Sequence, residues 1–186
     1  YLGIYYTGPN SAPKYNSIFG ESDDRNHAAK DICRSAVGYA VVGTYSETTG
    51  LNGNIYFLRI DAALNVVAGS ERYIDGEDLL LNDRILDSGS RTVSGSLDEG
   101  LALTSTVDGF VLACAITSTP AAGNGGKDIL LVKLDPVGNF VWKKLIGGTG
   151  DEVVTSIRET PDKGLLLFGT NTGSFTKSEC FSSNGR

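Results

Sequence analysis

The stretch DILLVKLDPVGNFVWKKLIGGTGDE, residues 128–152, decides the fold of this chain. It reads as an apolar strand, a tight turn, an amphipathic strand with two lysines, and a glycine-rich corner. The turn favours a hairpin, because Pro136 presets its own φ and Gly138 accepts a positive φ. The apolar strand predicts burial on both faces, and the pair Lys143 and Lys144 is typical of an edge strand.

Pieces of this stretch recur elsewhere in the sequence. A glycine followed by an apolar strand occurs at three places, residues 38–45, 109–116 and 164–171. Residues 54–61 (NIYFLRID) match residues 128–135 (DILLVKLD) at an offset of 74. Residues 15–24 match residues 142–151 at an offset of 127. Internal similarity of this kind is the signature of a repeat architecture.

Each repeat unit is expected to hold four antiparallel strands. The best-defined copies of these strands are expected at residues 152–160, 109–116, 128–134 and 140–146. Four strands that are buried on both faces and recur at roughly 50 residues predict a β-propeller blade. The alternative is a β-sandwich whose strands are similar by coincidence. The 24 glycines among 186 residues agree with an all-β chain that makes many tight turns.

A fuller motif supports the propeller prediction. The matching positions are residues 108–110, Lys127, Asp128, Lys133, Asp135, Gly138, Asn139, Trp142, Lys144 and residues 147–152. They resemble a bacterial family of β-propeller repeats, of the type D-G-G-[FY] … K-ϕ-D-x-x-G-N-ϕ-x-W … G-G-x-G-D-[DE], where ϕ is apolar. This family is common in secreted and surface proteins and lipoproteins of Bacteroidetes. The resemblance implies a propeller fold and an extracellular or outer-surface location, but no single activity. The first unit departs from the motif, because Ala68 stands where the second unit has its tryptophan.

The repeat divides the chain into six segments. We expect an extended lead-in at 1–14, the last strand of a preceding blade at 15–20, a blade at 21–77, an inserted loop at 78–96, a blade at 97–148 and an incomplete blade at 149–186. The leucines of the insertion have helical spacing, which predicts a short helix or a hairpin cap. About three blades would leave open apolar edges, and known propellers have about four to eight. We therefore expect these residues to belong to a larger propeller.

Composition excludes several classes of function. The net charge of −6 disfavours nucleic acid as a partner, and no apolar run has the length of a membrane span. His27 is the only histidine, which disfavours a catalytic triad or a zinc site. Cys114 lies in an apolar strand and is expected to be a small buried hydrophobe. A disulfide between Cys33 and Cys180 stays open.

Acidic residues recur at the corners that join one unit to the next. The candidate ligand-binding residues are Asp24, Asp98, Glu99, Asn124, Lys127, Asp151 and Glu152. A ring of such corners on one propeller face could bind calcium or a polar ligand such as a glycan. In the structural alternative, each carboxylate accepts a backbone N–H and holds its own corner in place.

Two functions follow from these expectations. The first is a non-catalytic binding or scaffold module whose partner is a protein, a glycan or the remaining blades of the same propeller. The second is a carbohydrate-active enzyme of the glycosidase type, with its carboxylates on the loop face. A carboxylate pair about 5–10 Å apart in one deep pocket would favour the enzyme. Carboxylates that are each tied to a backbone corner would favour the module.

Overall fold

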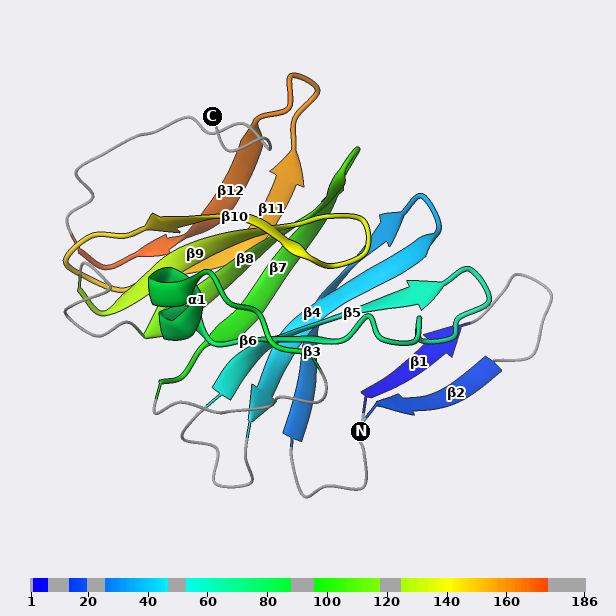
Figure 1. Ribbon diagram of the computed structural model, residues 1–186. Coiled ribbons are helices and arrows are strands. Elements are labelled where there is room, and N and C mark those ends of the chain that lie inside the picture. Colours follow the sequence, from blue (N-terminus) through cyan, green and yellow to red (C-terminus); the bar gives the residue numbers. More distant parts are fainter. Residues whose placement is uncertain are drawn as a thin grey trace.

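The computed structural model describes residues 26–46, 53–87, 96–117 and 125–173, and the backbone of residues 2–6 and 14–19 (Figure 1). Within these ranges the fold is all-β apart from one short helix. The strands form two four-stranded sheets and two two-stranded sheets, and every pairing within them is antiparallel. The prediction of an all-β chain is confirmed.

Strands that follow one another in sequence are neighbours in each sheet. The first sheet contains β3 (Asn26–Ser35), β4 (Gly38–Ser46), β5 (Gly53–Asp61) and β6 (Arg72–Ile74). The second contains β7 (Glu99–Thr106), β8 (Gly109–Thr117), β9 (Lys127–Leu134) and β10 (Phe140–Ile146). The third consists of β11 (Glu152–Glu159) and β12 (Leu165–Asn171). Short connections between neighbours produce this up-and-down order.

The fourth sheet lies near the N-terminus and consists of β1 (Leu2–Tyr6) and β2 (Lys14–Phe19). Residues 2–6, within the expected extended lead-in at 1–14, form a strand that pairs with β2. Local composition did not show this strand, because it is defined by its pairing with β2. Figure 1 shows the hairpin beside the first sheet.

The first two sheets begin with the same hairpin. Gly38 and Gly109 start β4 and β8 with φ values of 145° and 140°. A Cβ atom on them would lie 2.1 Å from the Ile60 carbonyl oxygen and 2.0 Å from that of Leu134. Only glycine therefore fits this position, where the neighbouring strand passes directly over the backbone.

The turn between β9 and β10 also has a counterpart. Asp135 accepts hydrogen bonds through Oδ1 from the backbone N–H groups of Val137 (2.9 Å) and Asn139 (2.8 Å). Asp61, the last residue of β5, accepts in the same way through Oδ1 from the backbone N–H groups of Ala63 and Asn65. Gly138 has a φ of 94°, so the predicted tight hairpin with a positive φ at this glycine is confirmed.

The sheets pack face to face in sequence order. Strand β7 packs against β3, β4 and β5, and β11 packs against β7, β8 and β9. The core between the first and second sheets contains Ala40, Val42, Ile55, Phe57, Leu103, Leu112, Leu130 and Val132, among others. The core between the second and third contains Ala102, Val111, Ala113, Ile129, Leu131, Val154 and Ile157. Strands β8 and β9 are thus buried on both faces, as their continuous apolar sequences predict.

Polar contacts also link the first two sheets. The β3 bulge brings Asp31 to β7, where its Oδ2 accepts the N–H of Leu103 at 3.0 Å. Arg72 of β6 donates from Nε to the carbonyl of Gly138 at 2.9 Å, in the β9–β10 turn. Each bond satisfies a backbone group outside the regular ladders. Together the two bonds fix the position of the first sheet relative to the second.

The helix α1 (Gly76–Asn82) follows β6, in the region where the insertion predicts a short helix or a cap. Asp75 is its N-cap and accepts the N–H of Asp78 at 2.9 Å. Leu79 is fully buried in the core between the first and second sheets, and Leu80 packs against the same core. The helix therefore extends the interface between these sheets.

Lys143 of β10 holds the C-terminal end of α1. Its Nζ donates to the carbonyls of Leu79 and Leu80 and forms an ion pair with Asp83 at 2.6 Å. A cation is favourable there because the last carbonyls of a helix carry partial negative charge. Strand β10 is an edge strand, as predicted. Lys143, however, binds α1 and does not serve to prevent pairing with another strand.

Candidate functional site

Asp98 lies immediately before β7 and is almost completely buried. Its Oδ2 accepts the N–H of Gly76 at 2.7 Å and the hydroxyl of Ser96 at 3.2 Å. Burial raises the pKa of Asp98 to about 7, and the charge of Asp75 adds to this, while the hydrogen bond from Gly76 opposes it. The carboxyl therefore connects the start of the second sheet to the end of the first.

Glu152 occupies the same place at the start of the third sheet. Asp98 and Glu152 both stand five residues before a buried core residue, Leu103 in β7 and Ile157 in β11, and both strands contain a bulge in between. The Oε2 of Glu152 accepts the N–H of Gly148 at 2.8 Å. In both corners, therefore, a buried carboxylate accepts the N–H of a glycine that follows the last strand of the preceding sheet.

Three of the predicted site residues lie together. Lys127 pairs with Glu99 (Nζ to Oε2, 3.0 Å), and its backbone N–H donates to Oδ1 of Asp151 at 2.8 Å. The Asp151 N–H in turn donates to the hydroxyl of Thr172 at 2.9 Å. The Lys127 and Glu99 side chains keep about a third and a quarter of their surface exposed. We name this group of Glu99, Lys127 and Asp151 the polar edge.

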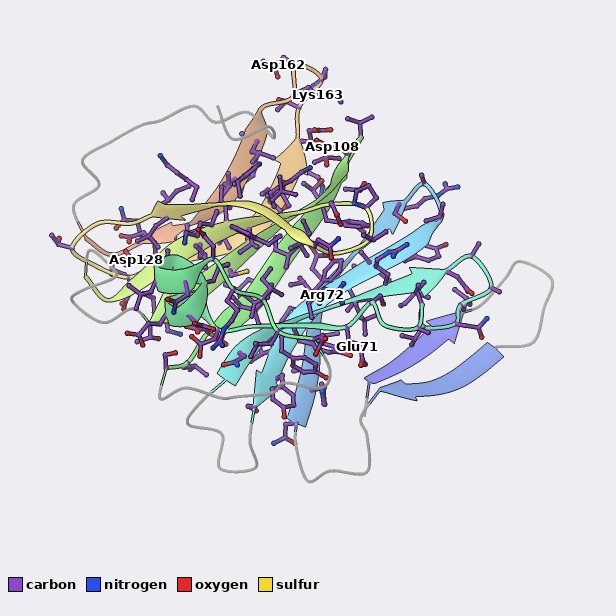
Figure 2. The ribbon with its side chains drawn as sticks, in the orientation of Figure 1. Glu71, Arg72, Asp108, Asp128, Asp162 and Lys163 are labelled. Carbon is purple, nitrogen blue, oxygen red and sulfur yellow. The ribbon has the colours of Figure 1, made fainter. Side chains whose placement is uncertain are left out.

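Close packing surrounds the glycines Gly147 and Gly150. A Cβ on Gly147 would lie 1.6 Å from Oδ1 of Asp128, a fully buried carboxylate labelled in Figure 2. A Cβ on Gly126 would lie 2.1 Å from Oδ1 of Asp151, and one on Gly150 would lie 2.4 Å from the nitrogen of Gly173. This stretch is glycine-rich because carboxylates and backbone occupy the space that side chains would need.

The predicted site residues therefore divide into three groups. Asp24 and Asn124 lie outside the described residues. Glu99, Lys127 and Asp151 form the polar edge, and Asp98 and Glu152 are buried in two separate corners. Asp98, Asp151 and Glu152 each accept a backbone N–H. In the described part of the chain, no three His, Cys, Asp or Glu side chains are grouped so that they could hold a metal ion.

An aromatic cluster that the sequence does not predict surrounds His27. His27 stands five residues before Ile32 of β3, the place taken by Asp98 and Glu152 in the other sheets. Its ring centroid lies 4.9 Å from that of Tyr45 and 5.0 Å from that of Tyr56. The tyrosines come from different strands, so only the pairing of β3, β4 and β5 brings the rings together.

A buried lysine at the opposite end of the second sheet was also missed as a structural element. Lys133 is almost completely buried and forms an ion pair with Oδ1 of Asp108 at 2.5 Å. The Thr106 hydroxyl also contacts the Lys133 ammonium. The hydrogen bond from Lys133 lowers the pKa of Asp108. Asp108 lies at the same end of the array as Asp162 and Lys163, as Figure 2 shows.

The described cysteines, Cys33 and Cys114, are free thiols, and Cys180 lies outside the described residues. Cys114 is fully buried within β8, which confirms its prediction as a small buried hydrophobe. Burial, with a contribution from the charge of Asp31, raises the pKa of Cys33 to about 12. Neither thiol has the low pKa and exposure of a reactive cysteine.

In comparisons with protein-family models, curated proteins and solved structures, no match was found. The helix α1 is too short to cross a bilayer, and no membrane-spanning helix occurs within the residues that the structure describes.

Proposed function

We propose that the chain is a section of a β-propeller and acts as a non-catalytic binding or scaffold module. Support for the propeller comes from two four-stranded up-and-down sheets and a third hairpin that pack face to face through equivalent positions. Propellers are built from such sheets in series, arranged about a central axis. About three blades would come from these residues, and the others would complete a larger ring.

One observation carries the non-catalytic assignment. The corner carboxylates of Asp98, Asp151 and Glu152 each accept a backbone N–H, and the two most deeply buried belong to corners between different sheets. Glycoside hydrolysis needs two carboxyl groups that converge on one bond, roughly 5–10 Å apart. Carboxyl groups that accept backbone N–H groups in separate corners stabilise the fold instead.

The polar edge is the surface that we propose for a protein or glycan partner. It offers an ammonium group and carboxylate oxygens at one end of the sheets, and Lys127 and Glu99 remain partly exposed. Exposed charges at the ends of strands suit hydrogen bonding to hydroxyl groups or to polar side chains. The extracellular or outer-surface location stays a prediction from the family resemblance.

The proposal is tested by assaying binding and hydrolysis on the same preparation. We expect retention on a glycan array or by a surface protein, with Lys127→Ala weakening binding on the order of tenfold. Lys163→Ala, at the opposite end of the array, is the matched control and should bind normally. A panel of aryl glycosides and polysaccharides should remain uncleaved. If hydrolysis is observed and is lost in Glu152→Gln, the chain is an enzyme and the proposal of a non-catalytic module is wrong.

A further inference from the structure

The first strands of the first, second and third sheets lie next to one another. Strand β7 contacts β3 and β11, and Figure 1 shows it between these two strands. Among the described residues, each of the three strands is an edge of its own sheet. We name their unpaired edges the inner edges. The N–H groups on an inner edge need acceptors other than a neighbouring strand of the same sheet.

One carboxylate serves two of the inner edges. Ile32 of β3 and Leu103 of β7 occupy equivalent positions, because each pairs with the third residue after a hairpin glycine, Gly38 or Gly109. The N–H of Ile32 donates to Oδ1 of Asp31 at 2.8 Å, and the N–H of Leu103 donates to Oδ2 of the same carboxylate at 3.0 Å. At this position, therefore, two inner edges together bind a carboxylate through both of its oxygens.

The third inner edge has the same N–H group without such a partner. Ile157 of β11 is fully buried and pairs with Leu167, the third residue after Gly164. The N–H of Thr160 donates to the Gly164 carbonyl. Hydrogen-bonded and non-hydrogen-bonded pairs alternate from there along the antiparallel ladder, so the N–H and the carbonyl of Ile157 both point to the inner edge. None of the described residues accepts this N–H.

The residue that would supply a carboxylate to Ile157 differs in the second sheet. Asp31 directly precedes Ile32, and its equivalent in β7 is Ala102. A methyl group cannot accept a hydrogen bond, so β7 offers Ile157 no counterpart of the Asp31 carboxylate. A buried N–H group without an acceptor is rare and unfavourable in folded proteins. The site next to Ile157 therefore favours an oxygen acceptor from outside these strands.

Arg158 brings a positive charge to the same place. Its Nη1 donates to the Ile157 carbonyl at 2.6 Å, and this carbonyl points to the inner edge. Burial raises the pKa of Cys33 in β3, and the charge of Arg158 opposes that rise, so the guanidinium lies within electrostatic reach of β3. The Arg158 side chain is exposed, and no described residue forms an ion pair with it. A guanidinium has five N–H donors, so others remain for a ligand.

The acids of the three first strands do not neutralise this charge, because each already has a partner. These acids are Asp31, Glu99, Glu152 and Glu159. Two further cations, Lys30 and Arg34, are exposed on β3 and form no ion pair with a described residue. The first strands are thus locally cationic on a chain whose net charge is −6. Such a local excess of positive charge attracts anions.

We propose that the inner edge at Ile157 and Arg158 binds the carboxylate of a small organic acid. One carboxylate oxygen accepts the Ile157 N–H, and the other accepts from the Arg158 guanidinium. The ligand thereby takes the place that the Asp31 carboxylate has between the first and second sheets. Charge-assisted hydrogen bonds of this kind are stronger than those between neutral groups. The site is separate from the polar edge, and binding there does not depend on the number of sheets in a complete propeller.

Amide NMR of the ¹⁵N-labelled chain tests the proposal, with sodium acetate as the probe and sodium chloride keeping the ionic strength constant. We expect the Ile157 amide proton to shift downfield along a saturable curve, with half-saturation at roughly 1–10 mM acetate. Arg158→Gln should weaken binding on the order of tenfold. Arg84→Gln is the matched control, since it removes the same charge from an exposed arginine that pairs with Asp78, and its curve should be unchanged.

Asp31→Ala provides a second test at the first two inner edges. This change gives β3 the residue type that β7 has at Ala102, so the Leu103 N–H loses its acceptor. The Leu103 amide should then respond to acetate in the variant and not in the unmodified chain.

Three results would overturn the inference. The first is an Ile157 amide that does not shift with acetate up to about 100 mM. The second is an equal loss of affinity in Arg158→Gln and Arg84→Gln, which would show diffuse attraction by net charge. The third is a folded Asp31→Ala chain whose Leu103 amide ignores acetate.

Discussion

Two residues at one turn position show how copies of a repeat can differ in strain. Gly138 and Leu64 each stand three residues after the aspartate that organises the turn, with φ values of 94° and 68°. The left-handed region is open to glycine but costs other residues about 1 kcal/mol or more. Leu64 thus carries a backbone cost that the equivalent glycine avoids.

Exchanging these residues gives a matched prediction. Gly138→Ala should lower the free energy of unfolding by about 1 kcal/mol, since a Cβ there is 3.4 Å from the nearest atom and only φ is unfavourable. Leu64→Gly should raise it by up to about 1 kcal/mol. Urea denaturation of both variants measures the two changes. Equal destabilisation by both would show that the leucine side chain matters more than its φ.

Asp98 predicts an unusual dependence of stability on pH. Its folded pKa, about 7, lies above the ordinary value of 3.8, so the folded state holds the proton more tightly. The free energy of unfolding should therefore fall as pH rises from about 4 to 7, and level off above 7. Asp98→Asn should remove this loss and gain roughly 1–4 kcal/mol relative to the unmodified chain across the window. Guanidinium denaturation at several pH values measures it.

Asp135→Asn is the control of opposite sign. Burial alone would raise the pKa of Asp135, but hydrogen bonds from Asn139 and Val137 lower it below 3.8. Its contribution to stability is present above about pH 4 and is lost as the pH falls through the folded pKa. If the free energy of unfolding of Asp98→Asn depends on pH in the same way as that of the unmodified chain, Asp98 does not cause the loss of stability between about pH 4 and 7.

At the scale of elements, helix α1 is held in place by its buried Leu79 and by Lys143 of β10. Leu79→Ala should lower the free energy of unfolding by about 2–5 kcal/mol, because it leaves a cavity between two sheets. Lys143→Met should cost about 1–3 kcal/mol through the carbonyls left without a donor. Hydrogen exchange should accelerate in α1 for both variants and stay unchanged in β11. Slow exchange in α1 of Lys143→Met would contradict the role assigned to this lysine.

The strands were the part of the fold that sequence could predict. Continuous apolar runs and the D-x-x-G-N turn placed β8, β9, β10 and β11 within one residue of their observed ends. Strand β1 was missed because its own sequence is short and its neighbours are rich in proline and serine. The pairing of Lys143 with α1 was missed because it joins residues 63 and 64 positions apart.

The candidate site was predictable in residue type but not in arrangement. Acidic residues at the corners could be read from the repeat, but their partners could not. Asp98 meets Gly76 across 22 positions, and Tyr45 and Tyr56 reach His27 only through strand register. Such contacts depend on which sheet packs on which face, and local sequence carries no information about that.

At the scale of the whole molecule, the packing predicts a gradient of local stability. Among the described residues, the second sheet is covered on both faces, whereas Leu166 and Phe168 on the outer face of β12 are exposed. In arrays where each unit contacts only its neighbours, end units open first. Amide exchange in the unmodified chain should be slowest in β8 and β9 and fastest in β12. Uniform protection across all strands would show that the array unfolds as a single cooperative unit.

The corner hydrogen bond has a practical consequence for engineering. Gly148 and Glu152 close their corner with three residues between them, whereas Gly76 and Asp98 close the equivalent corner with twenty-one. The same bond therefore forms the base of a short loop and of a long excursion that includes a helix. Foreign segments, such as an epitope or a small binding domain, can be grafted between this glycine and this acid while the sheets on either side keep their register.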